Sequence, residues 1–220
     1  MNALLIVCSA NVCRSRYAEQ LVRDQAPSDW SVSSAGTHAA DGSARCALVD
    51  RRLGGGHSGA SSDGSARPLT LESIEAAQLV LTAERAHRTA VLQVLPEARS
   101  RTFTLREFVL LVDQFGLDEQ ADSPSSLAAA LESLDHARPW LDLTDAGGPG
   151  WLRRTRRPDP GLLDVRDGHL ADAWAHRRSL RQIEDAAART VTVLRTWSAA
   201  HVPGDTDDGG TGRRAPDPRP

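Results

Sequence analysis

The chain opens with a short apolar segment, a polar loop and a helical pattern, and this order strongly restricts the fold. Residues 3–7 are apolar, and residues 14–26 follow the pattern of a helix. A short apolar run directly before a polar loop is typical of a strand in the core. We therefore expect residues 3–7 to form a buried strand, followed by a loop that runs into a helix N-terminus.

The loop between these two elements holds a cysteine and an arginine separated by five residues, Cys8 and Arg14. A loop that leaves a buried strand and enters a helix points successive backbone N–H groups inward and binds anions. The same N–H groups, the helix dipole and the Arg14 guanidinium would favour the thiolate form of Cys8. The pattern predicts a nucleophilic sulfur at the floor of a phosphate-binding loop.

This loop resembles that of the low-molecular-weight protein tyrosine phosphatases, whose motif reads Val-Cys-x-Gly-Asn-x-Cys-Arg-Ser-Pro. Here residues 7–16 read Val-Cys-Ser-Ala-Asn-Val-Cys-Arg-Ser-Arg. Ala10 replaces a glycine at a loop position suited to positive φ, and Arg16 replaces a proline favoured early in a helix. Residues 31–37 and 78–87 resemble the family's second and third strands with the segments that follow them.

The resemblance implies roles for particular residues. Cys8 would attack phosphorus, Arg14 would grip two phosphate oxygens, and Ser15 would donate a hydrogen bond to the Cys8 sulfur. Asn11 and Ser34 would brace the loop. Backbone N–H groups along the loop would bind the phosphate, namely those of Ser9, Ala10, Asn11, Val12, Cys13, Arg14 and Ser15. The reaction would pass through a cysteinyl-phosphate and would require neither a metal nor a cofactor.

A proton donor for the leaving group is expected near the C-terminal helix. The family carries its general acid in an Asp-Pro pair at this place, and Arg157-Pro-Asp-Pro160 supplies one. Asp159 is therefore the predicted acid. The aromatic residue that usually follows the pair is replaced by Gly161 and Leu162, which puts the substrate preference in question.

Three cysteines give no even disulfide framework and fit a reducing compartment. The resemblance implies a reversible disulfide between Cys13 and Cys8, whereas a small buried thiol is the plainer interpretation of Cys13. Cys46 is expected to be a structural thiol. A zinc site made of the three cysteines is not expected, because the sequence has no Cys-x2-Cys or His-x3-His spacing. His176 has no partner identifiable from sequence and is expected at the surface.

Alternating patterns predict an α/β chain with a parallel sheet. The resemblance implies a three-layer α/β/α fold of the flavodoxin-like kind, with a central four-stranded parallel sheet. One domain would span residues 1–202, with a flexible loop at 54–67 and an insertion at 114–156, before a disordered tail at 203–220. The expected strands are 3–7, 30–34, 78–82 and 100–103, and the expected helices are 14–26, 42–53, 83–94, 104–113, 124–137 and about 170–198.

Phosphotyrosine on proteins is the expected substrate, because Val12 stands where the arginine phosphatases of this family typically place threonine. Two other classes stay open: an arsenate reductase that relies on a small external thiol, and an inactive phosphoprotein-binding relative. In bacteria the partners of this family are often tyrosine kinases of polysaccharide export. A net charge of −3 implies no general attraction to nucleic acid or anionic membranes. The first apolar run is too short for an export signal, so a cytoplasmic enzyme is expected.

Overall fold

A computed structural model describes residues 1–54, 65–117, 126–143, 160–169 and 171–200. Its centre is a sheet of four parallel strands in the order β2-β1-β3-β4. The strands are β1 (Asn2–Cys8), β2 (Trp30–Gly36), β3 (Leu79–Thr82) and β4 (Thr102–Thr104). The expected parallel four-stranded sheet is confirmed.

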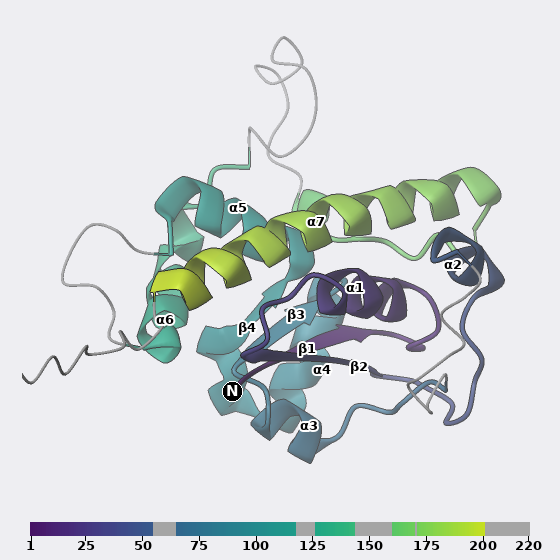
Figure 1. Cartoon of the computed structure of the whole chain (residues 1–220), viewed down its shortest axis with the longest axis horizontal. Helices are drawn as coiled ribbons and strands as arrows, with labels where there is room; N and C mark the ends of the chain where they lie inside the picture. Colours follow the sequence, from purple (N-terminus) through teal and green to yellow (C-terminus); the bar gives the residue numbers. More distant parts are fainter. Residues whose placement is uncertain (55–64, 118–125, 144–159, 170, 201–220) are drawn as a thin grey trace, which may run out of the picture.

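Helices cover both faces of this sheet and make three layers (Figure 1). One face is covered by α1 (Arg14–Arg23), α5 (Leu105–Phe115) and the long α7 (Ala173–Ala200). The other face is covered by α3 (Leu71–Glu75) and α4 (Arg85–Val94). Two further helices, α2 (Ala47–Arg52) and α6 (Leu127–Ala137), lie at the sides of the first layer.

The alternation of side chains along β1 explains why helices cover both faces of the sheet. Leu4 and Ile6 belong to the core beneath α1, α5 and α7, whereas Leu5 and Val7 belong to the smaller core beneath α3 and α4. All four side chains are buried. Because successive side chains of a strand point to opposite faces, a continuously apolar strand must be covered on both sides.

The carboxyl ends of the strands meet at one edge, where open α/β sheets bind ligands. β1 ends at Cys8 and leads through the loop to α1. The segment before α7, which includes the short 3-10 helix η4 (Pro160–Leu163), crosses the same edge. It is fixed there because Val165 N–H donates to the Ala83 carbonyl at 2.7 Å and Thr104 Oγ1 donates to the Leu163 carbonyl at 2.7 Å.

The structure also contains elements that the sequence did not predict. Helix α3 begins at a capping box in which Thr70 and Ser73 exchange hydrogen bonds. Two 3-10 turns, η1 (Pro96–Arg101) and η2 (Arg138–Trp140), precede β4 and follow α6. The predicted loop and insertion lie partly outside the described residues and the predicted tail lies wholly outside them, so the domain boundaries stay predictions. Among the described helices, none has the length and apolar character needed to cross a membrane.

Candidate active site

The Cys8 sulfur lies at the start of the loop, buried and 3.0 Å from the Ser15 hydroxyl. Backbone hydrogen bonds fasten the loop to the segment after β2, because Thr37 N–H donates to the Cys8 carbonyl and His38 N–H to the Ser9 carbonyl. Gly36 lies beneath this junction. A Cβ atom there would come within 2.5 Å of the Ser9 carbonyl oxygen, so only glycine permits the close approach.

Asn11 is the bracing residue inside the loop. Its side-chain amide donates to the Ser15 and Ser34 hydroxyls, both at 2.8 Å, and its oxygen accepts from Arg67 N–H at 2.9 Å. Because Ser15 Oγ accepts from Asn11, its own hydrogen can be donated to the Cys8 sulfur. Asn11 has φ +52°, and it is the one non-glycine residue in the described chain with positive φ. Ala10 does not occupy a position with positive φ, so that part of the expectation was wrong.

Beneath Asn11 a buried carboxylate holds the base of the loop together. Ser34 Oγ donates to Glu19 Oε2 at 2.5 Å. Glu19, which is 2% exposed, also pairs with Arg16 at 3.2 Å, Arg67 at 3.0 Å and Arg23. A buried carboxylate is tolerated when cations and hydroxyl donors surround it, and its loss would leave unpaired charges.

The Arg14 guanidinium is buried and contacts groups from three parts of the chain. One nitrogen, Nη1, pairs with Glu84 and donates to the Val165 carbonyl at 3.1 Å. The other, Nη2, donates to Ser9 Oγ at 3.2 Å and pairs with Asp167 Oδ2 at 2.8 Å. A phosphate bound in the loop would compete with these carboxylates for the same planar donors.

His87 approaches the loop from α4 in a defined tautomer. Its Nδ1 accepts from the Glu84 N–H at 3.1 Å, so Nε2 carries the hydrogen and donates to Ser9 Oγ at 2.8 Å. The Ser9 oxygen thus accepts from both His87 and Arg14, which leaves its own hydrogen for another acceptor. Burial and the positive charge of Arg14 lower the pKa of His87 to about 4, and the ring is neutral at physiological pH.

Two aspartates that the sequence reasoning passed over lie beside the loop, whereas Asp159 falls outside the described residues. Asp164 is bound to Arg85, whose side chain and backbone N–H donate at 2.9 Å. Burial raises the pKa of Asp164, but these hydrogen bonds and the Arg85 charge outweigh it and lower that pKa overall. Asp167 instead faces Arg14, and its second oxygen accepts from His169 N–H at 2.8 Å.

The position of Asp167 depends on the glycine that follows it. A Cβ atom on Gly168 would come within 2.5 Å of the backbone of Ala175 and His176, so this glycine allows the segment to lie directly against the start of α7. Ser179 Oγ completes the attachment by donating to the Arg166 carbonyl at 3.0 Å. The available sequence signal was an acidic residue shortly before the last helix, but the family's acid lies in an Asp-Pro pair and Asp167 precedes a glycine.

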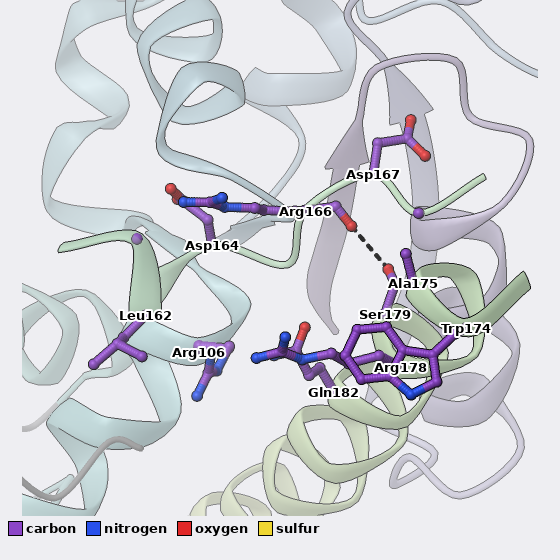
Figure 2. A pocket seen from close by; sticks show the side chains of 12 residues that line it. Arg106, Leu162, Asp164, Arg166, Asp167, Trp174, Ala175, Arg178, Ser179 and Gln182 are labelled. Carbon is purple, nitrogen blue, oxygen red and sulfur yellow. Dashed lines mark hydrogen bonds between the residues drawn. The ribbon is translucent and has the colours of Figure 1, made fainter. Parts of the chain in front are cut away.

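A pocket of about 280 Å³ lies between this segment and the first turns of α7 (Figure 2). Arg106, Arg166 and Arg178 give it a basic lining, and Trp174 presents an indole ring that is 60% exposed as a residue. Asp167 also lines this pocket while it contacts Arg14. The phosphate-binding loop and the basic pocket are therefore neighbours, and Asp167 is a residue common to both.

His176 is buried, 8% exposed, and its Nε2 lies 3.0 Å from the Cys13 sulfur. The expectation of a surface histidine was wrong, because Cys13 and Cys46 meet the first turn of α7 although they lie at least 130 residues away. The three cysteines are free thiols in the structure. The proposed disulfide between Cys8 and Cys13 thus stays a prediction.

Comparisons with known proteins agree with this geometry. The family model for low molecular weight phosphotyrosine protein phosphatase matches residues 3–126. A protein-arginine-phosphatase of Geobacillus stearothermophilus is 33% identical over 123 residues, which cover 51% of this chain and 78% of that protein. The low molecular weight protein-tyrosine-phosphatase Etp of Escherichia coli K12 is 28% identical over 162 residues, covering 71% of this chain and 96% of that protein.

Solved structures show the same fold. The YwlE arginine phosphatase from Geobacillus stearothermophilus matches with a TM-score of 0.61 at 21% identity, covering 92% of this chain and 98% of that one. The tyrosine phosphatase Wzb from Escherichia coli K30, solved with phosphate, matches with a TM-score of 0.55 at 19% identity, covering 87% and 96%.

Proposed function

The chain belongs to the low molecular weight phosphotyrosine protein phosphatase family, and from this premise we propose that it hydrolyses phosphotyrosine on proteins through a cysteinyl-phosphate. The observation that carries the proposal is the Cys8 sulfur, 3.0 Å from the Ser15 hydroxyl at the start of a loop that also supplies Arg14. A nucleophile, a donor to its sulfur and an oxyanion-binding guanidinium are thus brought together by one short stretch of chain.

In the first step the Cys8 thiolate attacks phosphorus, the sulfur–phosphorus bond forms, and the bond to the tyrosine oxygen breaks. Arg14 and the loop N–H groups hold the equatorial oxygens, where negative charge must be stabilised. The Ser15 hydroxyl steadies the thiolate before attack and again when sulfur departs. In the second step water attacks phosphorus, the sulfur–phosphorus bond breaks, and phosphate leaves. None of these steps calls for a metal ion or a cofactor.

We assign the proton transfers to Asp167. Its carboxyl oxygen is 2.8 Å from Arg14, the residue that grips the phosphate, and its side chain is 36% exposed, so a leaving group can reach it. Asp167 would protonate the departing phenolate and then, as a carboxylate, accept a proton from the attacking water. Asp164 is a poorer candidate because Arg85 donates hydrogen bonds to both of its oxygens. Asp159, the residue predicted from sequence, remains the competing candidate.

The basic pocket beside Asp167 suggests which phosphoproteins are accepted. Arg106, Arg166 and Arg178 would attract acidic residues that flank the phosphorylated side chain, and Trp174 offers a face for an apolar or aromatic group. A bacterial tyrosine kinase in the cytoplasm is the partner class that we propose. Phosphoarginine is the second candidate, favoured by the 33% identity to a protein-arginine-phosphatase.

The test is hydrolysis of matched phosphotyrosine and phosphoarginine peptides by the wild type and Cys8→Ser, with vanadate as a competitor. Vanadate-sensitive turnover of phosphotyrosine that is lost in Cys8→Ser supports the proposal. Preferential turnover of phosphoarginine would assign the second candidate. An inert wild type that reduces arsenate with a small thiol, or binds phosphopeptides without turnover, would instead support one of the two other classes.

A further inference from the structure

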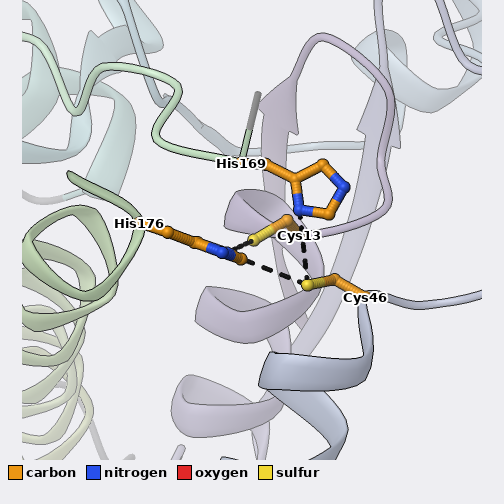
Figure 3. A group of neighbouring side chains, drawn as sticks. All are labelled: Cys13, Cys46, His169 and His176. Atoms are coloured by element: carbon orange, nitrogen blue, oxygen red, sulfur yellow. Dashed lines mark hydrogen bonds between the residues drawn. The ribbon is translucent and has the colours of Figure 1, made fainter. Parts of the chain in front are cut away.

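Four metal-ligating side chains converge on one point outside the catalytic loop (Figure 3). They are Cys13, Cys46, His169 and His176, and their ligand atoms all lie within 4.8 Å of one another. The Cys13 sulfur is 3.0 Å from His176 Nε2. The Cys46 sulfur is 3.5 Å from His169 Nδ1 and 3.8 Å from His176 Nε2.

Each ligand comes from a different element that the fold fixes in place. Cys13 immediately precedes α1, and Cys46 precedes α2 and is tied to the loop because its N–H donates to the Val12 carbonyl at 3.0 Å. His176 lies in the first turn of α7, where its N–H donates to the Asp172 carbonyl. His169 follows the Gly168 contact with that helix and is exposed, which leaves a route for an ion to enter.

We propose that these four residues bind a zinc ion. Zn–S bonds of about 2.3 Å and Zn–N bonds of about 2.0 Å at tetrahedral angles place the ligand atoms about 3.3–3.8 Å apart. The three sulfur–nitrogen distances, 3.0, 3.5 and 3.8 Å, lie close to this range. Two thiolates and two imidazoles form one of the usual structural zinc sites, and hard ions such as Mg²⁺ and Ca²⁺ prefer oxygen ligands.

The proton balance of binding is simple. Burial raises the pKa of the Cys13 thiol, so without a metal its sulfur carries a proton. Zinc replaces one proton on each cysteine and takes the lone pairs of two neutral histidines, so binding releases up to two protons to solvent. No oxidation or reduction takes place, and all four positions are filled by protein. The ion would therefore be structural and would not activate water.

Zinc at this place would join the parts of the active site that lie far apart in sequence. Cys13 is adjacent to Arg14, and His169 is two residues from Asp167, so one ion would fix the end of the phosphate loop relative to the aspartate segment. Ligation would also withhold the Cys13 sulfur from Cys8. The sequence analysis did not expect such a site because Cys13, Cys46 and His169 are separated by 33 and 123 residues, without a short ligand pair.

The experiment measures metal binding by the full chain directly. The protein is purified under reducing conditions, depleted with a chelator, and titrated with zinc(II) or cobalt(II). We expect one ion per chain and a cobalt spectrum of a tetrahedral site with two thiolates. A rise in melting temperature of about 10 °C is expected at a free zinc concentration about a thousand times Kd.

Variants locate the site. Cys46→Ser, His176→Gln and His169→Gln should each weaken zinc binding by at least about tenfold and remove a feature of the cobalt spectrum. Cys8→Ser and His136→Gln, which changes an exposed histidine on α6, should bind like the wild type. Because His169 is exposed, its variant keeps the test valid if the buried substitutions prevent folding.

Three results would overturn the proposal. One is no stoichiometric binding by the reduced wild type. Another is an octahedral cobalt spectrum, or binding that disappears in Cys8→Ser, because the ion would then occupy a different site. The third is a Cys13–Cys46 disulfide in protein purified without reductant and with excess zinc, since that would assign the proximity of the sulfurs to redox chemistry.

Discussion

Cys8 and Cys13 are five residues apart in sequence, yet they lie in two different regions. Cys8 faces the Ser15 hydroxyl on the phosphate side of the loop, whereas Cys13 faces His176 and Cys46 on the side of α7 and α2. In the first region Cys8, its hydroxyl donor Ser15 and Arg14 come from one short stretch of sequence, whereas the second region combines Cys13 and Cys46 with residues 169–176 near the start of α7. We propose that the first thiol is a nucleophile and the second a metal ligand, because the two have different neighbours.

The largest expected effect is the loss of turnover in Cys8→Ser, which distinguishes the Cys8 region from the Cys13 region. Cys8→Ser should reduce turnover of phosphotyrosine by at least about 10⁴-fold, since the nucleophile is removed, while zinc binding stays unchanged. Cys46→Ser is the matched change in the other region and should weaken zinc binding by at least about tenfold while leaving measurable turnover. Steady-state kinetics and zinc titration on both variants check this. Equal loss of turnover in the two would break the distinction.

Asp167 belongs to the Cys8 region through its contact with Arg14, and its substitution tests the proposed proton donor. Asp167→Asn should lower kcat for phosphotyrosine by about 10²- to 10³-fold, because the leaving phenolate loses its proton donor. The loss should be smaller for p-nitrophenyl phosphate, whose leaving group needs less help. Asp164→Asn and Asp159→Asn are the matched controls, measured with both substrates. A leaving-group-dependent loss confined to Asp159→Asn would transfer the role to that residue.

Glu19 tests the support beneath the phosphate loop. Glu19→Gln should lower the free energy of unfolding by about 3 kcal/mol, because three arginines and the Ser34 hydroxyl lose a buried carboxylate. Urea unfolding, with the exposed Glu132→Gln as a control, measures the difference. A difference below about 0.5 kcal/mol would mean that this network contributes little stability.

The lowered pKa of His87, which lies beside the loop that holds Cys8, predicts that the free energy of unfolding depends on pH. Its pKa of about 4 in the folded protein lies below the value of about 6.5 expected in the unfolded chain. Its stabilising contribution is therefore complete above pH 6.5 and is lost as the pH falls through 4, amounting to roughly 3 kcal/mol. The unfolding free energies of wild type and His87→Gln should converge over this interval. A constant difference between pH 7 and 4 would contradict the assignment.

The smallest expected effect concerns the basic pocket. Arg178→Gln should raise KM for an acidic phosphopeptide by about threefold to tenfold and leave kcat nearly unchanged, because it removes attraction in the ground and transition states alike. Arg177→Gln alters the neighbouring exposed arginine, which does not line the described pocket. The same rise in KM for a neutral phosphopeptide would show that charge recognition is not the cause.

The sequence predicted those features of the fold and site that depend on residues adjacent in the chain. The apolar run at residues 3–7 led directly to the buried strand β1, and the alternating elements led to the parallel sheet; both are confirmed. The reactivity of Cys8 stays a prediction. The contacts of Asn11 with Ser15 and Ser34 occur where the resemblance placed bracing residues.

Contacts between distant segments could not be predicted from the local sequence. Asp167 reaches Arg14 across 153 residues, and His176 reaches Cys13 across 163. Nothing local distinguishes Asp167 from a turn residue, and His176 is one histidine in a long polar helix. Their positions follow from how α7 packs along α1 and from the absence of a Cβ atom on Gly168, which only the folded chain makes visible.

Alkylation by iodoacetamide, followed residue by residue in the zinc-loaded protein, tests most directly whether Cys8 alone is the reactive thiol. We predict that Cys8 is modified in step with the loss of phosphatase activity, that vanadate protects it, and that Cys13 and Cys46 react only after zinc is chelated. Modification of Cys13 at the rate of Cys8 with zinc present, or loss of activity without modification of Cys8, would contradict the separate roles of the two sulfurs.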